Sequence, residues 1–306
     1  MRIRLAGYQG AASVHTRGLH HLAQGLAAAG FDVDIEEDVT AQGIPAKTLF
    51  EKTEREPAQF CYMASGYLTA RAPSLAVLDL PLTVSDRLRA QEALDGLAGR
   101  MLADHVAQRT DFHVLGFWDN GVRHISNRSH PIRSAADCSG LVIRTLDNEL
   151  YQSALLAFGF KPVVTDVRDL VQAVATGAVD AQENPLTNML NFGLHKHHSH
   201  LSLTGHIYGA ALLLCRASWF RMLPQDMADA VTSAAAASTR AQRSFAAEED
   251  RLALRQLRDF GVQVIETGDL DMDSFRKSAA PVISGALSGI EGRLLDAYFG
   301  EGHRLG

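Results

Sequence analysis

Two side chains in the middle of the chain, Arg144 and Asn184, offer the clearest chemistry in this sequence. Arginine presents a planar fork of donors that matches a carboxylate, and it stays charged at any relevant pH. Asparagine adds both a donor and an acceptor of hydrogen bonds. Together they could bind an organic acid. An arginine at a strand end can equally pair with an acidic neighbour, here Asp180, and the residues alone leave both interpretations open.

The segment around these two residues predicts a βαβαβ unit that would bring them together. Short apolar runs typical of buried parallel strands alternate with helix-like segments that end at glycines. The expected strands and helices lie at residues 141–143, 148–158, 162–165, 167–176 and 178–181. In open α/β sheets, ligands bind beyond the carboxyl ends of the strands. Arg144 ends the first of these strands and Asn184 follows the third, so we expect both at one rim of the sheet.

The rest of the chain predicts a second lobe of similar construction and one long helix. The expected strands are 3–7, 31–36, 59–63, 75–80, 112–117 and 261–266, and the expected helices are 14–29, 46–53, 85–106 and 273–299, the last interrupted at Pro281. From Pro224 to Phe260 there is no further glycine or proline, and the residues are good helix formers. A helix of that length would span ~55 Å, more than one lobe.

We therefore expect an α/β fold of two lobes that exchange chain. Lobe I would hold residues 1–119 and 206–247, and lobe II would hold residues 120–205 and 248–306. The helix at about 224–260 would be shared by both lobes. The segment 118–123 would be the first crossing from lobe I to lobe II.

Three motifs in the chain resemble one known family. They read Gly116-Phe-Trp-Asp-Asn-Gly-Val-Arg123, Gly140-Leu-Val-Ile-Arg144 and Gly177-Ala-Val-Asp-Ala-Gln-Glu-Asn-Pro185. They resemble the DctP-type solute-binding subunits of TRAP (tripartite ATP-independent periplasmic) transporters, and the resemblance extends over most of the chain. It implies a periplasmic-binding-protein-like fold with an interlobe cleft and a long helix spanning both lobes.

The same resemblance implies a function, a location and partners. Arg144 would clamp the carboxylate of a small organic acid, assisted by Arg123 and Asn184. Sialate-binding members carry an acidic residue and an arginine after the strand 59–63, where this chain has Ala64 and Tyr67, which favours a smaller or more apolar acid. The expected partners are that acid and the membrane permease of the transporter. The expected location is the periplasm, and the expected state is a monomer.

Four further side chains are expected to line the cleft. Trp118 precedes the turn that leads to Arg123, and Tyr67 follows a strand, so both could form walls, although aromatic side chains are more often part of a core. Gln9 and His15 follow the first strand, as do Tyr8 and Ser13. By the rule for strand ends, they would face the cleft from the other lobe.

No set of residues predicts catalysis, a cofactor or a metal site. Ser65 lacks the flanking glycines of a nucleophile elbow, and there is neither a phosphate loop nor a GxGxxG motif. The histidines between residues 195 and 200 would diverge on a helix end and turn, so we expect a solvated surface there. Two alternatives stay open: an enzyme that holds a carboxylate with Arg144 and uses His15 or His206 as acid or base, and a ligand-sensing domain.

Bulk properties exclude other classes of function. The 306 residues carry a net charge of −6 without a basic tract, which argues against binding to nucleic acid or to an anionic membrane. No apolar run approaches the ~20 residues that span a bilayer. The N-terminus shows no pattern of an export signal, so either this is a mature chain with an added methionine, as the resemblance implies, or the protein is cytosolic. The three cysteines are far apart and predict no disulfide framework.

Overall fold

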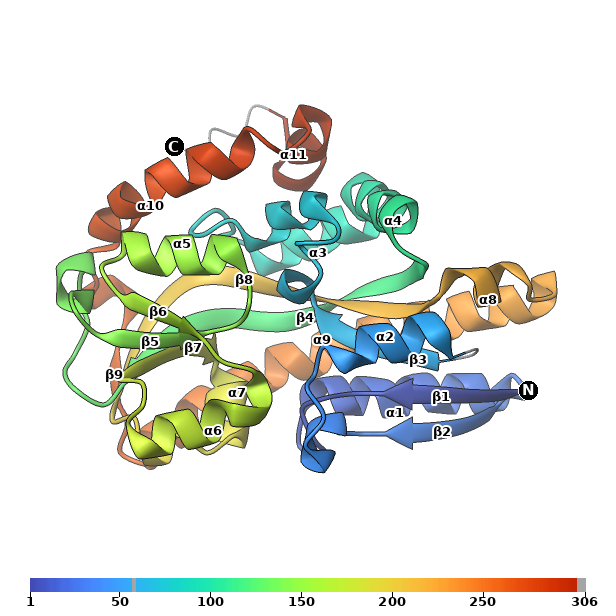
Figure 1. The fold of residues 1–306 in the computed structure, drawn as a ribbon, viewed down its shortest axis with the longest axis horizontal. Coiled ribbons are helices and arrows are strands. Elements are labelled where there is room, and N and C mark those ends of the chain that lie inside the picture. The colour runs from blue at the N-terminus through green and yellow to red at the C-terminus, as the bar shows by residue number, and fades with distance from the viewer. Residues whose placement is uncertain (57–58, 302–306) are drawn as a thin grey trace.

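One mixed sheet runs through the whole molecule in the computed structural model, which describes residues 1–56 and 59–301 (Figure 1). In this part of the chain the strand order is β2-β1-β3-β8-β4-β7-β5-β6, and β9 pairs with β8. The strands are β1 (Arg2–Ala6), β2 (Asp32–Glu36), β3 (Gln59–Ala64), β4 (Phe112–Asn127), β5 (Val142–Thr145), β6 (Lys161–Val164), β7 (Ala181–Pro185), β8 (His200–Arg216) and β9 (Gln263–Ile265).

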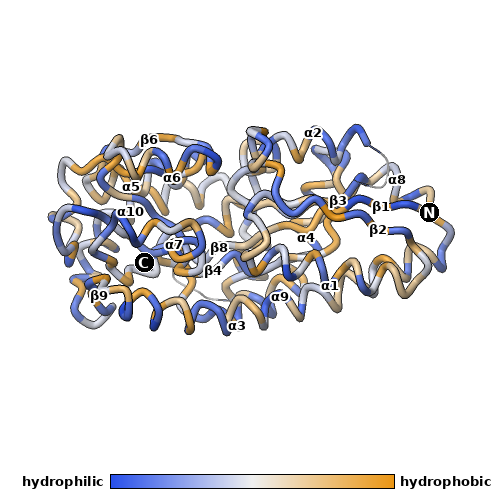
Figure 2. The backbone as a smooth tube through the Cα atoms, turned by 90° about the horizontal axis from the view of Figure 1, so that it is seen from below, coloured by the Kyte–Doolittle hydropathy of each residue, from blue (hydrophilic) through white to orange (hydrophobic). Residues whose placement is uncertain are grey.

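Helices cover both faces of this sheet (Figure 1). The α-helices are α1 (Val14–Ala28), α2 (Thr48–Arg55), α3 (Arg87–Asp95), α4 (Leu97–Arg109), α5 (Glu149–Ala157), α6 (Val167–Thr176), α7 (Leu186–Asn191), α8 (Ala217–Arg221), α9 (Gln225–Asp259), α10 (Met272–Leu287) and α11 (Gly292–Phe299). Short 3-10 helices include η2 (Ser65–Tyr67) and η3 (Pro73–Asp79). Figure 2 shows hydrophilic and hydrophobic residues alternating along the helices, as expected for helices that bury one face.

The two long strands β4 and β8 join two lobes. The first half of β4 pairs with the second half of β8, beside β3, and the second half of β4 lies between β7 and the first half of β8. Their register shifts between Asp119 and Val122. Gly121, at this shift, has φ of +83°, a conformation that glycine adopts without strain. The shift therefore marks the passage from one lobe to the other.

Separate hydrophobic cores define the lobes. The first lobe is built around β1, β3 and the adjoining halves of β4 and β8, and the second around β5, β7 and the other halves. Helix α9 contributes Val231 and Ala235 to the first core and Ala253 and Leu257 to a core of the second lobe. The prediction of a two-lobed α/β fold with a long helix spanning both lobes is confirmed.

The exact division of the chain between the lobes remains a proposal. Helix α11 places Leu294 and Tyr298 in the first core, against α3 and α4, although the sequence predicts residues 248–306 in lobe II. We therefore propose to assign residues 290–299 to the first lobe and keep the other boundaries. The chain then crosses between the lobes again after α10.

Several local predictions were wrong. Residues 75–80 were expected as a strand, but they belong largely to η3, which begins at Pro73 and turns the Asp79 side chain inward. The helix expected at 85–106 is two helices, because the chain bends at Gly96. The expected break at Pro281 is absent, since α10 continues through it with Phe275 and Ile283 buried on one face.

Candidate functional site

Arg144 lies within β5 with its side chain buried, only 2% of the residue being exposed. Its Nε and Nη2 donate to the carbonyl oxygen of Thr165, at 2.9 and 2.5 Å. Asp180, its expected partner in the structural interpretation, instead accepts from the backbone N–H of Val142 at 2.9 Å. Among the described residues, no carboxylate lies within 4.0 Å of the Arg144 guanidinium. Arg144 is therefore a buried cation without a counter-ion from this part of the chain.

Two tyrosines of the first lobe lie close to the arginines of the second. Burial raises the pKa of Tyr67, while the charge of Arg144 and a hydrogen bond to it act in the opposite direction. Burial also raises the pKa of Tyr8, whose phenol lies near Tyr67 and is influenced by Arg123. The rings of Tyr8 and Tyr67 meet edge to face, with centroids 6.2 Å apart. The structure thus brings the predicted residues Arg144, Arg123 and Tyr67 together across the lobes.

Arg123, unlike Arg144, has a buried carboxylate partner. Its Nε donates to Glu183 Oε2, and its Nη2 donates to Glu183 Oε1 at 2.9 Å. Glu183 also accepts from the Thr145 hydroxyl at 2.9 Å and lies 3.6 Å from His206 Nε2. Burial alone would raise the pKa of Glu183, but the charge of Arg123 and its hydrogen bonds to the carboxylate, together with the nearby His206, lower it to about 2. The Arg123 side chain is therefore fixed in a pair with ionised Glu183.

Asn184 is the last-but-one residue of β7 and not, as expected, a residue beyond the strand. Its Oδ1 accepts from Arg123 Nη2 and from Asn188 Nδ2, both at 3.3 Å, and its Nδ2 donates to Gln182 at 2.6 Å. The predicted neighbourhood of Asn184 and Arg123 is thus present. It arises because β7 pairs with β4 in a register that places Arg123 opposite Pro185.

Trp118 and His15 pack with Tyr62 inside the first lobe. The His15 and Tyr62 rings stack with centroids 4.8 Å apart, and Trp118 lies 5.8 Å from Tyr62. Trp118 is only 1% exposed, as is typical of a core residue. Burial lowers the pKa of His15 to about 3, which makes it a weak base at neutral pH. Gln9, on the same turn, accepts from the Ser13 hydroxyl at 2.9 Å. Direct contact of Trp118, His15 and Gln9 with a ligand stays a prediction.

A polar link that could not be recognised from the sequence also joins the lobes. Asp79 of η3 is fully buried and accepts from Asn148 Nδ2 at 3.1 Å and from the Tyr151 hydroxyl at 3.4 Å. Asn148 also donates to the carbonyl oxygen of Gly66 at 3.1 Å. Burial raises the pKa of Asp79 to about 6, against the hydrogen bonds that favour its charged form. Asn148 was recognisable only as a cap of α5, because its partners lie in the other lobe.

Further contacts join the facing surfaces of the lobes. Lys47 pairs with Asp147, and Asn191 Nδ2 donates to the carbonyl oxygen of Ala12 at 3.1 Å. Arg168 Nη1 donates to the carbonyl oxygen of Gly43 at 3.0 Å. Each of these contacts joins a residue of the first lobe to a residue of the second. The structure is therefore that of a protein whose lobes are closed over the site.

The solvated surface predicted for the histidine cluster is only partly present, because His197 is exposed and His195 and His200 are half-buried. His198 is fully buried, with its Nδ1 3.0 Å from the Ser126 hydroxyl, whereas His195 stacks on the Phe260 ring. These side chains diverge to different partners. Within residues 1–56 and 59–301, no group of three or more His, Cys, Asp or Glu side chains is placed to hold a metal ion. The same residues contain no helix long and apolar enough to cross a membrane.

Solved structures share this architecture over nearly the full chain. A TRAP periplasmic solute-binding protein from Polaromonas sp. JS666, bound to D-erythronate, superposes with a TM-score of 0.91 at 25% identity, covering 99% of this chain and 100% of that one. The sugar acid binding protein DctPAm from Advenella mimigardefordensis, in complex with galactonate, gives a TM-score of 0.90 at 24% identity, covering 98% and 96%. The fold with its interlobe cleft is therefore that of the two-lobed TRAP binding proteins.

Sequence relatives point the same way. The chain is 30% identical over 224 residues to a solute-binding protein of Verminephrobacter eiseniae, covering 73% of this chain and 66% of the relative. It is 29% identical over 204 residues to the 2,3-diketo-L-gulonate-binding periplasmic protein YiaO of Escherichia coli, covering 67% and 61%. The match thus spans somewhat less than two thirds of each relative. Residues 10–288 match bacterial extracellular solute-binding protein family 7, and the chain belongs to this DctP family.

Proposed function

We propose that this chain is the extracytoplasmic solute-binding subunit of a TRAP transporter. It binds one small organic acid between its lobes in the periplasm and delivers it unchanged to the membrane permease. The observation that carries this proposal is Arg144, which is buried, held along one edge by Thr165 and without a carboxylate partner among the described residues. An unpaired buried charge is costly. The site is therefore complementary to an anion that comes from outside the chain.

Two features support a hydroxylated acid as the ligand. The solved relatives hold D-erythronate and galactonate, and the Escherichia coli relative is named for 2,3-diketo-L-gulonate. Around Arg144 and Arg123 the chain also offers the hydroxyls of Tyr67 and Tyr8 and the amide of Asn184, which contacts that of Asn188. Such groups can satisfy the hydroxyls of an acid as well as its carboxylate. The absence of an acidic residue and an arginine around Ala64 and Tyr67 supports an acid smaller than sialate.

A ligand screen followed by recovery of the ligand tests the proposal. Thermal-shift measurements would compare aldonates, uronates, pantoate and succinate, and calorimetry would give the stoichiometry for the best acid. We expect one acid bound per chain and, after prolonged incubation, the same acid recovered by mass spectrometry. Chemically altered acid would show that the chain is an enzyme. Stabilisation by neutral sugars equal to that by their acids would contradict the role of Arg144.

A further inference from the structure

A row of polar side chains crosses the sheet of the second lobe beside Arg144. In the parallel pairing of β5 with β7, Arg144 lies opposite Gln182, and in the antiparallel pairing of β7 with β4, Gln182 lies opposite Ser126. Residues that pair across strands have their side chains on the same face, and so does Asn184, which lies two residues after Gln182. The sheet thus places these four side chains on one face, at the proposed acid site.

Hydrogen bonds connect Asn184 through this row to a buried histidine. Asn184 Nδ2 and Gln182 Oε1 are 2.6 Å apart, and Gln182 Nε2 and Ser126 Oγ are also 2.6 Å apart. Ser126 Oγ in turn lies 3.0 Å from His198 Nδ1. We call these four side chains the buried relay. Gln182, Ser126 and His198 are at most 1% exposed, so bulk water does not compete for their hydrogen bonds.

The direction of the relay is set at its other end by Arg123. All guanidinium nitrogens are donors, so the Asn184 atom that lies 3.3 Å from Arg123 Nη2 has to be the acceptor Oδ1. The amino group of Asn184 then faces Gln182 and donates to its oxygen. The amino group of Gln182 is consequently on the other side and donates to Ser126.

The same reasoning places the proton of His198. Among the described residues, Ser126 Oγ has no partners besides Gln182, from which it accepts, and His198, so its hydroxyl hydrogen goes to His198 Nδ1. Burial, with smaller effects of Arg128 and His197, lowers the pKa of His198 to about 3, so the ring is neutral and carries one proton. That proton is on Nε2, which is buried without a hydrogen-bond partner in this part of the chain.

Asn184 therefore offers a ligand a donor and no acceptor. Its Oδ1 already accepts from Arg123 and from Asn188, and one of its two N–H groups donates to Gln182. The second N–H has no acceptor among the described residues. Since Arg144 also presents only donors, an oxygen of the ligand carboxylate is the group that fits between them.

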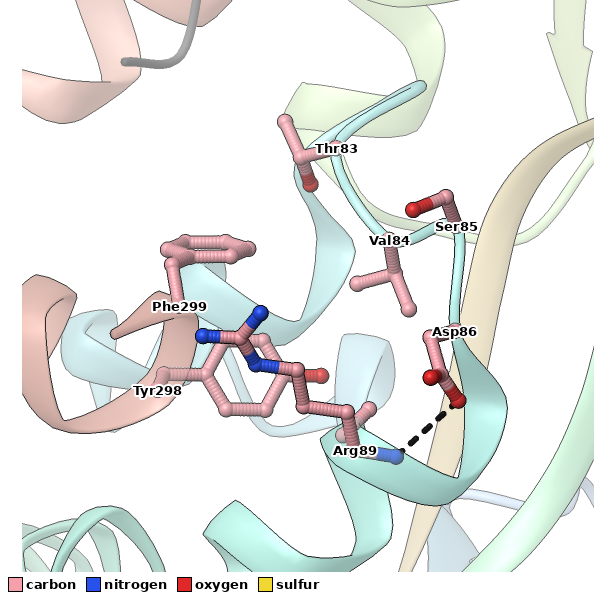
Figure 3. A pocket seen from close by; sticks show the side chains of 8 residues that line it. Thr83, Val84, Ser85, Asp86, Arg89, Tyr298 and Phe299 are labelled. Atoms are coloured by element: carbon pink, nitrogen blue, oxygen red, sulfur yellow. Dashed lines mark hydrogen bonds between the residues drawn. The ribbon is translucent and has the colours of Figure 1, made fainter. Parts of the chain in front are cut away.

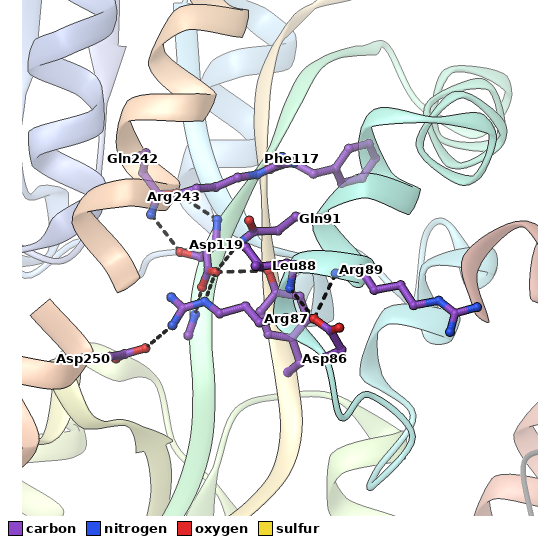
Figure 4. Close-up of polar contacts among 12 residues, drawn as sticks. Asp86, Arg87, Leu88, Arg89, Gln91, Phe117, Asp119, Gln242, Arg243 and Asp250 are labelled. Carbon is purple, nitrogen blue, oxygen red and sulfur yellow. Dashed lines mark hydrogen bonds and ion pairs between the residues drawn. The ribbon is translucent and has the colours of Figure 1, made fainter. Parts of the chain in front are cut away.

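Other polar places in the molecule are not connected to the acid site in this way. At the hinge, Arg87 donates to Asp119 and to Asp250, the latter at 2.7 Å, and so ties α3, β4 and α9 together (Figure 4). A hollow of about 270 Å³ between the segment 83–86, α3 and the last two residues of α11 has walls from the first lobe only (Figure 3). The buried relay differs from both, because it ends at a residue of the acid site.

We propose that Gln182, Ser126 and His198 are positioning residues of the acid site, and that the buried relay holds Asn184 with its free N–H toward the carboxylate of the acid. None of the three needs to contact the ligand. Without the relay Asn184 can rotate, and the acid has to fix it on binding, which lowers the affinity. This inference rests on the proposed function and deepens it, because it states which side of the Asn184 amide meets the acid.

The first test is a double-mutant cycle by calorimetry with the best acid of the screen. Ser126→Ala should weaken binding by roughly threefold to tenfold, the effect of about one hydrogen bond. In the Asn184→Ala background the same change should cost less than about twofold, because the residue that the relay positions is gone. Equal loss in both backgrounds would overturn the proposal. Gln182→Met, which keeps the length of the side chain, provides the same cycle if Ser126→Ala does not fold.

Ser202→Ala is the matched control of this cycle. Ser202 is also a fully buried serine of the second lobe, and its hydroxyl donates to the carbonyl oxygen of Ile132 at 2.6 Å. Its removal should lower the melting temperature in the same way as Ser126→Ala and leave the affinity within about twofold. If Ser202→Ala weakens binding as much as Ser126→Ala, loss of stability and not loss of position explains both effects.

The second test needs no ligand and remains valid if the chain binds none of the acids, an outcome that would contradict the proposed function alone. In nuclear magnetic resonance spectra of the acid-free chain, the side-chain amide signals of Asn184 are assigned by their absence in Asn184→Ala. We expect them to shift or broaden in Ser126→Ala and to stay unchanged in Ser202→Ala. The ring of His198, assigned by its absence in His198→Gln, should carry its proton on Nε2. Unchanged Asn184 signals in Ser126→Ala, or a proton on Nδ1 of His198, would overturn the relay.

Discussion

The two buried arginines of the site, Arg123 and Arg144, differ in their counter-charges. Arg123 shares two hydrogen bonds with the ionised carboxylate of Glu183, so its charge is balanced within the fold. Arg144 is held by a carbonyl oxygen and by no carboxylate of the described chain. Removal of Arg123 would leave Glu183 buried and unpaired, which is costly for folding. Removal of Arg144 leaves no unpaired charge in the free protein. Removal of Arg123 should therefore lower the stability of the fold, whereas removal of Arg144 should lower the affinity for the ligand.

Arg144→Ala is expected to abolish most binding and spare the fold. Truncating one partner of a desolvated charge pair costs ~2–5 kcal/mol, and at ~1.4 kcal/mol per tenfold this is roughly thirty-fold to several-thousand-fold in affinity. Arg144→Lys should also bind poorly, because lysine cannot present two parallel donors. Calorimetry with the best acid and melting curves of the ligand-free variants would measure both effects. The exposed Arg133→Ala is the matched control. A large loss of melting temperature in Arg144→Ala would instead indicate a structural role.

Asp79 should make the protein more stable as the pH falls from neutrality toward 4. Its folded pKa of about 6 lies above the ~3.9 of an unfolded aspartate, so the folded state binds the proton more tightly between these values. The ionised form is thus disfavoured in the fold by roughly 3 kcal/mol above pH 6, and this penalty is lost as the pH falls through 6 toward 4.

Asp79→Asn tests this directly, because it keeps the shape of the side chain and removes the charge. The stability of Asp79→Asn minus that of the wild type, from urea unfolding, should be largest at pH 7.5 and shrink toward pH 4. Contributions of other titrating groups cancel in this difference. Asp273→Asn, at a side chain that is 93% exposed, is the control for the substitution itself. A flat difference for Asp79→Asn would show that Asp79 is already ionised in the fold at no cost.

At the scale of elements, the sequence predicts structure well where the signals are local. Helix α6 was predicted with its observed limits, because Asp166 caps its start and Gly177 ends it with φ of +77°. The strands β5 and β6 were predicted within two residues of their observed limits, because their short apolar runs are also local signals. Non-local contacts were not predictable: the pairing of Arg123 with Glu183 depends on the register of β4 against β7. Likewise, the hydrogen bond between Asp79 and Asn148 depends on how the lobes meet.

The break between α3 and α4 shows how one glycine positions an element. A Cβ added at Gly99 would lie 1.8 Å from the carbonyl oxygen of Leu94, a backbone atom that cannot move aside cheaply. Gly99→Ala should therefore destabilise the protein by at least ~1–3 kcal/mol through overpacking, although alanine normally stabilises a helix relative to glycine. Urea unfolding would measure this. Gly268→Ala, where a Cβ meets nothing within 4 Å, is the control. Unchanged stability of Gly99→Ala would mean that α4 can shift without cost.

At the scale of the whole molecule, β4, β8 and α9 connect the lobes, and separate side-chain contacts close them. Those contacts are single hydrogen bonds or surface ion pairs, such as Lys47 with Asp147 and Asn191 with Ala12, and the buried hydrogen bond of Asp79 with Asn148, which carries the desolvation cost of the ionised Asp79. Exposed ion pairs contribute little, typically below ~1 kcal/mol each. Without a ligand, the buried Arg144 also lacks the anion that would balance its charge. Closure of the free protein is thus weakly favoured at best, and the lobes should open by a hinge motion.

An acid that binds Arg144 should therefore draw the lobes together. Its carboxylate supplies the counter-charge that Arg144 lacks. In the closed lobes Tyr67 lies near Arg144, and Tyr8 lies near Tyr67, so an acid bound there can contact both lobes and favours the closed state. Small-angle X-ray scattering should give a smaller radius of gyration with saturating acid than without. Arg144→Ala, at the same acid concentration, should keep the larger radius. If calorimetry confirms binding and the radius does not change, the lobes are already closed in the free protein, and the acid must then enter by a local movement such as one of η2.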